Sequence, residues 1–139
     1  MPTASKRVSV PRDEGRSHLE KAQQFLSSGF ASAERAQYDA ALLGAIHAGI
    51  SAADAVSITL AGVRSTDPDH SRAVDLLSEI AGGSKEVAGH ARQLRQLLGK
   101  KNTVEYESRR ATAAESADAL KRADRLVEWA SEILASAGR

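Results

Sequence analysis

The most continuous apolar stretch of the chain runs from Tyr38 to Val63. Its polar interruptions are few, and no Lys, Arg or Glu occurs until Arg64. A helix at the surface of a globular protein carries one apolar stripe and one charged face. The pattern therefore predicts a long central helix that other helices enclose, with small residues that let them approach closely. Gly44, Gly49 and the polar residues argue against a membrane span.

Apolar positions at three- and four-residue spacing predict further helices on both sides of this stretch. These helices are expected over Glu14–Glu34, His70–Ala81, Lys85–Leu98 and from the capping box Thr112–Glu115 to just before Gly138. Asp69 and Ser84 are expected to cap the second and third of them. Thr103–Tyr106 fits either a loop or an irregular continuation of the preceding helix. Four or five helices with short connections predict an all-α antiparallel bundle.

The chain has 139 residues, which is enough for one domain with a proper core. We expect a flexible N-terminal tail over residues 1–13, because two prolines and an excess of basic residues lie there. Residues 14–139 are expected to form the single helical domain. The start of the chain carries no apolar signal region, and the sequence contains no cysteine, which fits a cytoplasmic protein.

Several kinds of chemistry find no support in the sequence. Neither phosphate-binding glycine motif occurs, which leaves nucleotide binding through such loops unsupported. The four histidines have no compact ligand spacing, so we expect no metal site and no cofactor; the four are His18, His47, His70 and His90. All of them except His47 are most simply surface residues.

Two polar groups remain as candidates for a site. On the central helix, His47, Ser51 and Asp54 follow at steps of four and three, so they share one face. They form either a satisfied buried network or a helix face at a dimer interface, and the family resemblance given below implies a third possibility, the floor of a cleft. Burying Asp54 without a partner is costly, so we expect one across the bundle, such as Lys101 or Asn102.

The second group is the basic stretch between residues 85 and 110. It contains seven Lys or Arg and three Glu, an excess of four positive charges that would attract phosphate. The alternative is an ordinary solvated face. Lys100, Arg109 and Arg110 are candidate phosphate-binding residues, whereas Tyr106 stands alone as an aromatic residue and supports base stacking weakly.

The order of helices, together with two segments, resembles the HEPN superfamily of small helical-bundle proteins. The segments are AIHAGISAADA (45–55) and KKNTVEYE (100–107), and the resemblance spans about Arg16 to Ala135. The resemblance implies a bacterial homodimer without membrane attachment. Active members are metal-independent endoribonucleases that bring an Arg-x4-6-His motif from each chain into one cleft.

In this sequence Lys101 stands at the arginine position of that motif, Asn102 follows it, and Tyr106 stands at the histidine position. Lysine pairs with phosphate as a point charge, and tyrosine with a pKa near 10 is a poor proton shuttle at pH 7. Ribonuclease activity by the usual route is therefore expected to be weak or lost. Ser108 also departs from the His-x-Tyr extension that partner nucleotidyltransferases modify in some members.

Three hypotheses follow from the resemblance. The first is a non-catalytic homodimer that binds RNA, a nucleotide, or a protein partner such as a cognate antitoxin or nucleotidyltransferase, in a toxin–antitoxin or defence context. The second is a divergent endoribonuclease that uses Lys101, Asn102 and Tyr106 with Asp54 and His47, or with a nearby arginine replacing the missing one. The third is a structural dimerisation adaptor.

Overall fold

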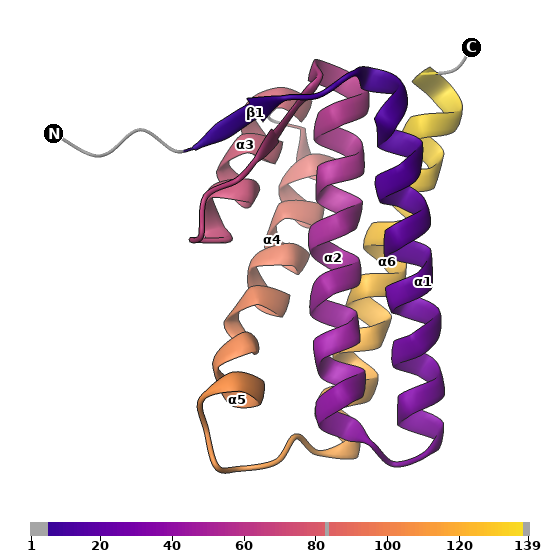
Figure 1. Cartoon of the computed structure of the whole chain (residues 1–139), viewed down its shortest axis with the longest axis vertical. Coiled ribbons are helices and arrows are strands. Elements are labelled where there is room, and N and C mark those ends of the chain that lie inside the picture. The colour runs from indigo at the N-terminus through magenta and orange to yellow at the C-terminus, as the bar shows by residue number, and fades with distance from the viewer. Residues whose placement is uncertain (1–5, 83, 138–139) are drawn as a thin grey trace, which may run out of the picture.

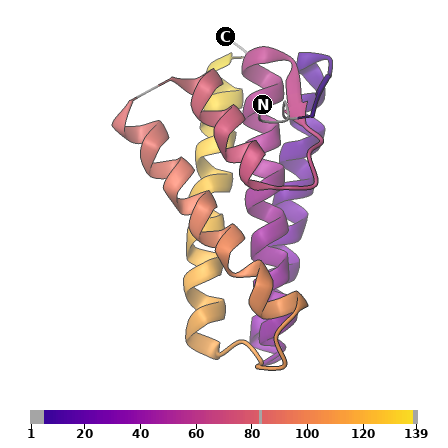
Figure 2. The ribbon, with the colours of Figure 1, turned by 90° about the vertical axis from the view of Figure 1, so that its left-hand side faces the viewer.

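Three long helices form the body of the protein in a computed structural model that describes residues 6–82 and 84–137. They are α1 (Gly15–Glu34), α2 (Tyr38–Ala61) and α6 (Ala113–Ala137), and they run side by side along the long axis (Figure 1). Figure 2 shows the same arrangement from the side, with α3 (Ser71–Ala81) and α4 (Lys85–Gly99) crossing in front. The short helix α5 (Lys101–Glu105) continues α4. The predicted all-α bundle is therefore confirmed.

Helix α2 is the core of this bundle. α1 and α6 cover one side of it and α3 and α4 the other (Figure 1). Leu42, Ile46, Val56 and Ile58 are completely buried. By length and mean hydropathy α2 passes the test for a membrane span, but 72% of its most apolar window is buried inside the protein. Its apolar character is thus explained by burial against the other helices.

Glycines set the close approach of α1 and α2. A Cβ atom at Gly44 would lie 3.1 Å from the Gly29 Cα and 3.1 Å from the Phe25 carbonyl oxygen. Both neighbours are backbone atoms that cannot easily move. Helix α1 continues through Gly29 without interruption to Glu34. Gly29 therefore serves the close packing of α1 on α2 and does not end the helix.

The starts of α6 and α4 follow the expected capping chemistry, whereas the N-cap of α3 is His70 and not the expected Asp69. Thr112 Oγ1 accepts a hydrogen bond from the Glu115 N–H at 3.1 Å, and Glu115 Oε1 accepts one from the Thr112 N–H at 3.1 Å. The predicted capping box is confirmed. Ser84 Oγ likewise accepts from the Val87 N–H at 3.2 Å. Gly62 ends α2 in the left-handed region, with φ of 66°.

The prediction of a flexible tail over residues 1–13 is wrong for the part that the structure describes. Strand β1 (Arg7–Ser9) pairs antiparallel with β2 (Val63–Ser65), and the turn η1 (Arg12–Glu14) leads into α1. Arg7 Nη1 donates to Glu79 Oε2 of α3 at 2.8 Å. Residues 1–5 lie outside the described residues. A three-residue strand has too short a pattern to be recognised, and its pairing partner lies beyond α2.

Candidate functional site

The motif residues Lys101, Asn102 and Tyr106 line one cavity of about 390 Å³, here called the α5 pocket. α5 is helical, so the second of the two conformations considered for this segment is the one adopted. The remaining lining comes from the start of α3 and the end of α4: Pro68, Asp69, His70, Ser71, Arg95, Leu98 and Gly99. The pocket thus adds an imidazole and a guanidinium to the motif.

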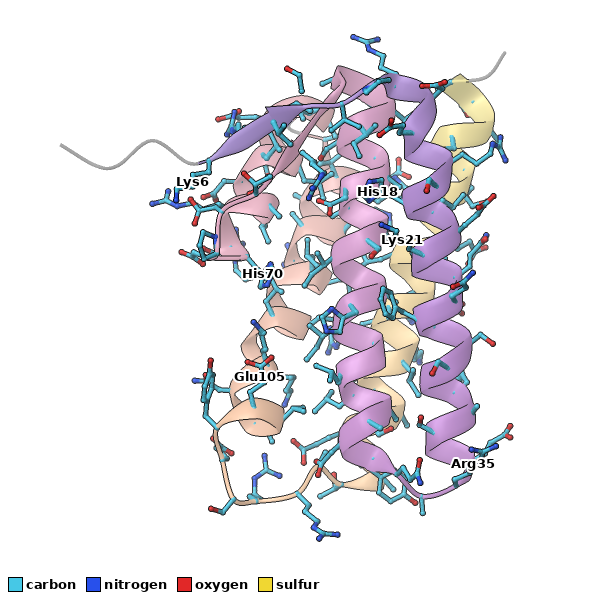
Figure 3. All side chains as sticks on the ribbon, viewed as in Figure 1. Lys6, His18, Lys21, Arg35, His70 and Glu105 are labelled. Carbon is cyan, nitrogen blue, oxygen red and sulfur yellow. The ribbon has the colours of Figure 1, made fainter. Side chains whose placement is uncertain are left out.

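The helical hairpin of α3 and α4 brings these groups together. The chain turns between the two helices near Gly82, so the start of α3 returns to the end of α4. Asp69 fixes that start, because its Oδ1 accepts from the Ser71 N–H at 3.0 Å and from Ser71 Oγ at 2.7 Å. His70 is consequently held beside α5. Figure 3 shows His70 and Glu105 on the side of α2 that faces away from α1.

The charges of the α5 pocket favour an anion. Arg95 makes no ion pair within residues 6–82 and 84–137. Lys101 Nζ lies 3.7 Å from Glu105 Oε1, a loose pair within one helix that is worth only a few tenths of a kcal/mol. Asp69 is the one acidic residue in the lining, and its carboxylate is engaged by Ser71. Within the lining itself two permanent cations therefore face one carboxylate, and Glu105 stands beside Lys101 outside that lining.

The imidazole of His70 is suited to accept a proton. Burial lowers its pKa from the ordinary value, and the charges of Lys101 and His47 lower it further, while those of Asp69 and Glu105 act in the opposite direction. His70 is therefore neutral at pH 7, with one ring nitrogen free to act as an acceptor.

The polar face of α2 lies mainly against α1. The His47 ring packs on Phe25 of α1, with centroids 5.3 Å apart and planes inclined by 32°. Burial raises the pKa of Asp54 to about 7, and the charges of Arg64 and Lys21 act in the opposite direction. Within residues 6–82 and 84–137 Asp54 makes no ion pair, so the expected partnership with Lys101 or Asn102 is not formed, and the charges that act on it come from α1 and β2.

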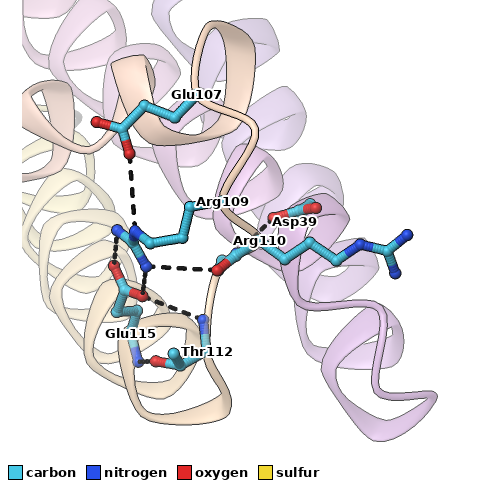
Figure 4. A network of polar contacts seen from close by, with 7 residues as sticks. Asp39, Glu107, Arg109, Arg110, Thr112 and Glu115 are labelled. Atoms are coloured by element: carbon cyan, nitrogen blue, oxygen red, sulfur yellow. Dashed lines mark hydrogen bonds and ion pairs between the residues drawn. The ribbon is translucent and has the colours of Figure 1, made fainter.

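The remaining basic candidates lie outside the α5 pocket. Arg109 is held by Glu115 through bonds of 2.6 and 3.1 Å, and these bonds lower the pKa of Glu115 to about 2 (Figure 4). Arg110 extends away from this pair and lines a hollow at the α1–α2 turn. Lys100 lines a separate cavity of about 460 Å³ together with Arg122. Of these residues, Arg109 is already bound to Glu115, which belongs to the capping box of α6.

Two of the histidines assigned to the surface are structural neighbours of other groups. The His90 ring stacks on buried Trp129, with centroids 4.3 Å apart and planes 9° from parallel. His18 is half-buried, and burial lowers its pKa, with the charges of Lys21 and Arg64 adding to the effect. Neither is the exposed side chain that was expected.

His70 is the pocket residue that the sequence motif misses. It stands 31 positions before Lys101, beyond any local spacing. The sequence nevertheless contains a signal that His70 lies near the motif. Counting equal numbers of residues outward from the turn near Gly82 places His70 opposite roughly residue 95 in an antiparallel helical hairpin. Arg95 was counted in the basic stretch, but only the hairpin turns it toward the motif.

In the ranges 6–82 and 84–137, no group of three or more His, Asp or Glu side chains is placed to hold a metal ion. No curated protein matches the sequence. The family model of the HEPN domain, however, matches residues 16–134, close to the span over which the resemblance was noted. This match covers most of the helical bundle, including α2 and the α5 pocket. The chain belongs to the HEPN domain family.

Proposed function

We propose that this HEPN protein binds RNA as a homodimer and that the α5 pocket holds a backbone phosphate. The observation that carries the proposal is the convergence of Arg95, Lys101 and Asn102 on one cavity. Arginine offers a planar fork that matches phosphate oxygens, and an amide adds a neutral donor. Arg95 thereby supplies the guanidinium that the degenerate motif lacks at position 101.

Cleavage of RNA is expected to be weak or absent, because Tyr106 occupies the histidine position of the family motif. Tyr106 is 77% exposed and lacks the imidazole that the family motif places at this position. The family membership supports a role in a toxin–antitoxin or defence context. A cognate antitoxin or nucleotidyltransferase is the protein partner that this context implies.

The binding test compares variants of the α5 pocket with a basic residue outside it. Arg95→Ala and Lys101→Ala should each weaken binding of a labelled single-stranded RNA roughly tenfold or more in a fluorescence anisotropy titration. Arg110→Ala should leave binding unchanged, because that side chain lines a different hollow. Light scattering should give a mass twice that of the chain. Equal losses in all three variants would contradict the assignment, and no RNA binding at all would favour the adaptor role.

A divergent metal-independent endoribonuclease is the second candidate, and His70 is the observation that favours it. A neutral imidazole in the α5 pocket can take the proton of a ribose 2′-hydroxyl as that oxygen attacks the adjacent phosphorus. The 5′-oxygen leaves with a proton, and the products are a 2′,3′-cyclic phosphate and a 5′-hydroxyl. Arg95 and Lys101 would stabilise the extra negative charge on the phosphorus centre.

An RNA cleavage assay separates the two candidates. In an active enzyme, His70→Gln should lower the cleavage rate by 100-fold or more, in keeping with loss of a general base. Tyr106→Phe should then have the smaller effect. Absence of cleavage above background in the wild type, with RNA binding intact, would leave the non-catalytic binding protein as the function.

A further inference from the structure

An exposed aromatic ring of α1 packs on the polar face of α2. Phe25 is 39% exposed, although its neighbour Leu26 on α1 is buried in the core. The ring packs on His47 of α2, with ring centroids 5.3 Å apart. Phe25 is therefore an apolar ring that is supported by His47 and partly open to solvent.

Cationic side chains lie on both sides of this ring. Lys21 is one helical turn before Phe25 on α1, and both Lys21 and Arg64 act on the carboxylate of Asp54. On the other side of α2, His70 lines the α5 pocket together with Arg95 and Lys101. Figure 3 shows His18 and Lys21 on the same face of the molecule as His70, with α2 between them.

We propose that Phe25, backed by His47, is a stacking surface for an unpaired base of a strand whose phosphates bind in the α5 pocket. The inference rests on the proposed RNA binding and goes beyond it by naming a base subsite. A single strand presents phosphates and planar bases alternately. This face presents cations, an aromatic ring and cations in the same alternation. In a duplex both faces of each base are already stacked inside the helix, so the subsite selects unpaired RNA.

Phe30 provides a matched control on the same helix. It is also exposed, at 45%, but it borders a different hollow with Tyr38, Leu120, Lys121 and Asp124. The charges there are mixed, and the hollow shares no residue with the α5 pocket. A general effect of removing an exposed phenylalanine from α1 would therefore appear equally in both variants.

The test uses three labelled probes of equal length in anisotropy titrations: a single-stranded RNA, an abasic strand with the same phosphates, and an RNA duplex. Phe25→Leu should weaken binding of the single-stranded RNA about 5- to 100-fold, the range for loss of one base stack. Binding of the abasic strand should not change. Phe30→Leu should change neither, and the wild type should bind the duplex more weakly than the single strand.

Phe25→Trp keeps an aromatic face and supplies a second readout. It should restore binding of the single-stranded RNA, and its indole fluorescence should be quenched by that RNA and not by the abasic strand. This variant answers the question even if Phe25→Leu folds poorly.

Three results would overturn the base subsite. The first is an equal loss for the RNA and the abasic strand, and the second is no loss in Phe25→Leu while the wild type binds RNA. The third is a change from dimer to monomer in Phe25→Leu, which would make Phe25 a subunit contact. Failure of the wild type to bind any strand would contradict the proposed function itself, so the two failures are distinguishable.

Discussion

Asp54 is a half-buried carboxyl group within the most apolar helix of the protein. Burial raises the pKa of this carboxyl group to about 7, whereas the pKa of an aspartate in an unfolded chain is about 3.9. Between these two values the folded state holds a proton that the unfolded state has lost. Stability should therefore fall by about 1.4 kcal/mol for each pH unit between roughly pH 4 and 7, and then level off.

Asp54→Asn should remove this dependence, because the amide resembles the protonated carboxyl and does not ionise. Urea unfolding at several pH values should show equal stability of both proteins near pH 4. The variant should then gain a growing advantage up to about pH 7. Asp124→Asn, at an exposed position on α6, is the control. Parallel stability curves for the wild type and Asp54→Asn would contradict the prediction.

Glycine has opposite roles in two helices of this bundle. An alanine Cβ at Gly44 would press on backbone atoms of α1 at 3.1 Å, whereas one at Gly89 in α4 would meet nothing within 4 Å. Gly44→Ala should therefore cost about 1–3 kcal/mol of unfolding free energy, as overpacking does. Gly89→Ala should add about 0.5–1 kcal/mol, because alanine favours a helix.

Thermal unfolding of both variants checks this pair of predictions. Near the midpoint of a domain of this size, 1 kcal/mol corresponds to about 4 °C, so the two midpoints should move in opposite directions. Destabilisation by both substitutions would show that α4 also tolerates no added methyl group.

The capping box of α6 is a second local feature that stabilises a helix. Thr112→Ala removes the oxygen that accepts from the Glu115 N–H, and it should lower the unfolding free energy by about 1 kcal/mol. Thr112→Ser keeps the hydroxyl and should restore most of that loss. Chemical denaturation measures both. Identical values for the alanine and serine variants would show that the hydrogen bond contributes nothing.

The helices could be predicted from the sequence because their signals are local. The spacing of apolar residues, Thr112–Glu115 at the start of α6 and Ser84 before α4 all act within one or two turns. Strand β1 could not be predicted in the same way. Its three residues are all exposed, so they carry no apolar pattern, and their pairing partner lies on the far side of two helices.

The candidate site is a property of the whole molecule, and so it could be predicted only in part. Lys101, Asn102 and Tyr106 are close in sequence, and they share the α5 pocket as expected of a compact motif. His70 precedes α3 and reaches the pocket only because α3 and α4 fold back on each other, and Phe25 of α1 meets the polar face of α2 only through the packing of these two helices. The charge partners of Asp54 were misjudged for the same reason.

The net charge of +1 is too small to attract RNA from a distance, so binding should depend on the local cluster. The logarithm of the binding constant should fall linearly with the logarithm of salt concentration, and Lys101→Ala should reduce that slope by about 0.7. Lys121→Ala, on the exposed face of α6, should leave the slope unchanged. Anisotropy titrations at several salt concentrations measure the slopes. Equal reductions would indicate general charge attraction.

The position of α6 against α2 also has a consequence for synthesis. The ribosome makes α1 and α2 first, and they can close as a hairpin because only residues 35–37 separate them. The side of α2 that α6 covers stays open while α3, α4 and α5 are being made. The nascent chain therefore exposes its most apolar helix for a long interval, which makes it a natural client for chaperones that bind emerging chains. The order of the helices thus sets the period in which this protein is most prone to aggregation.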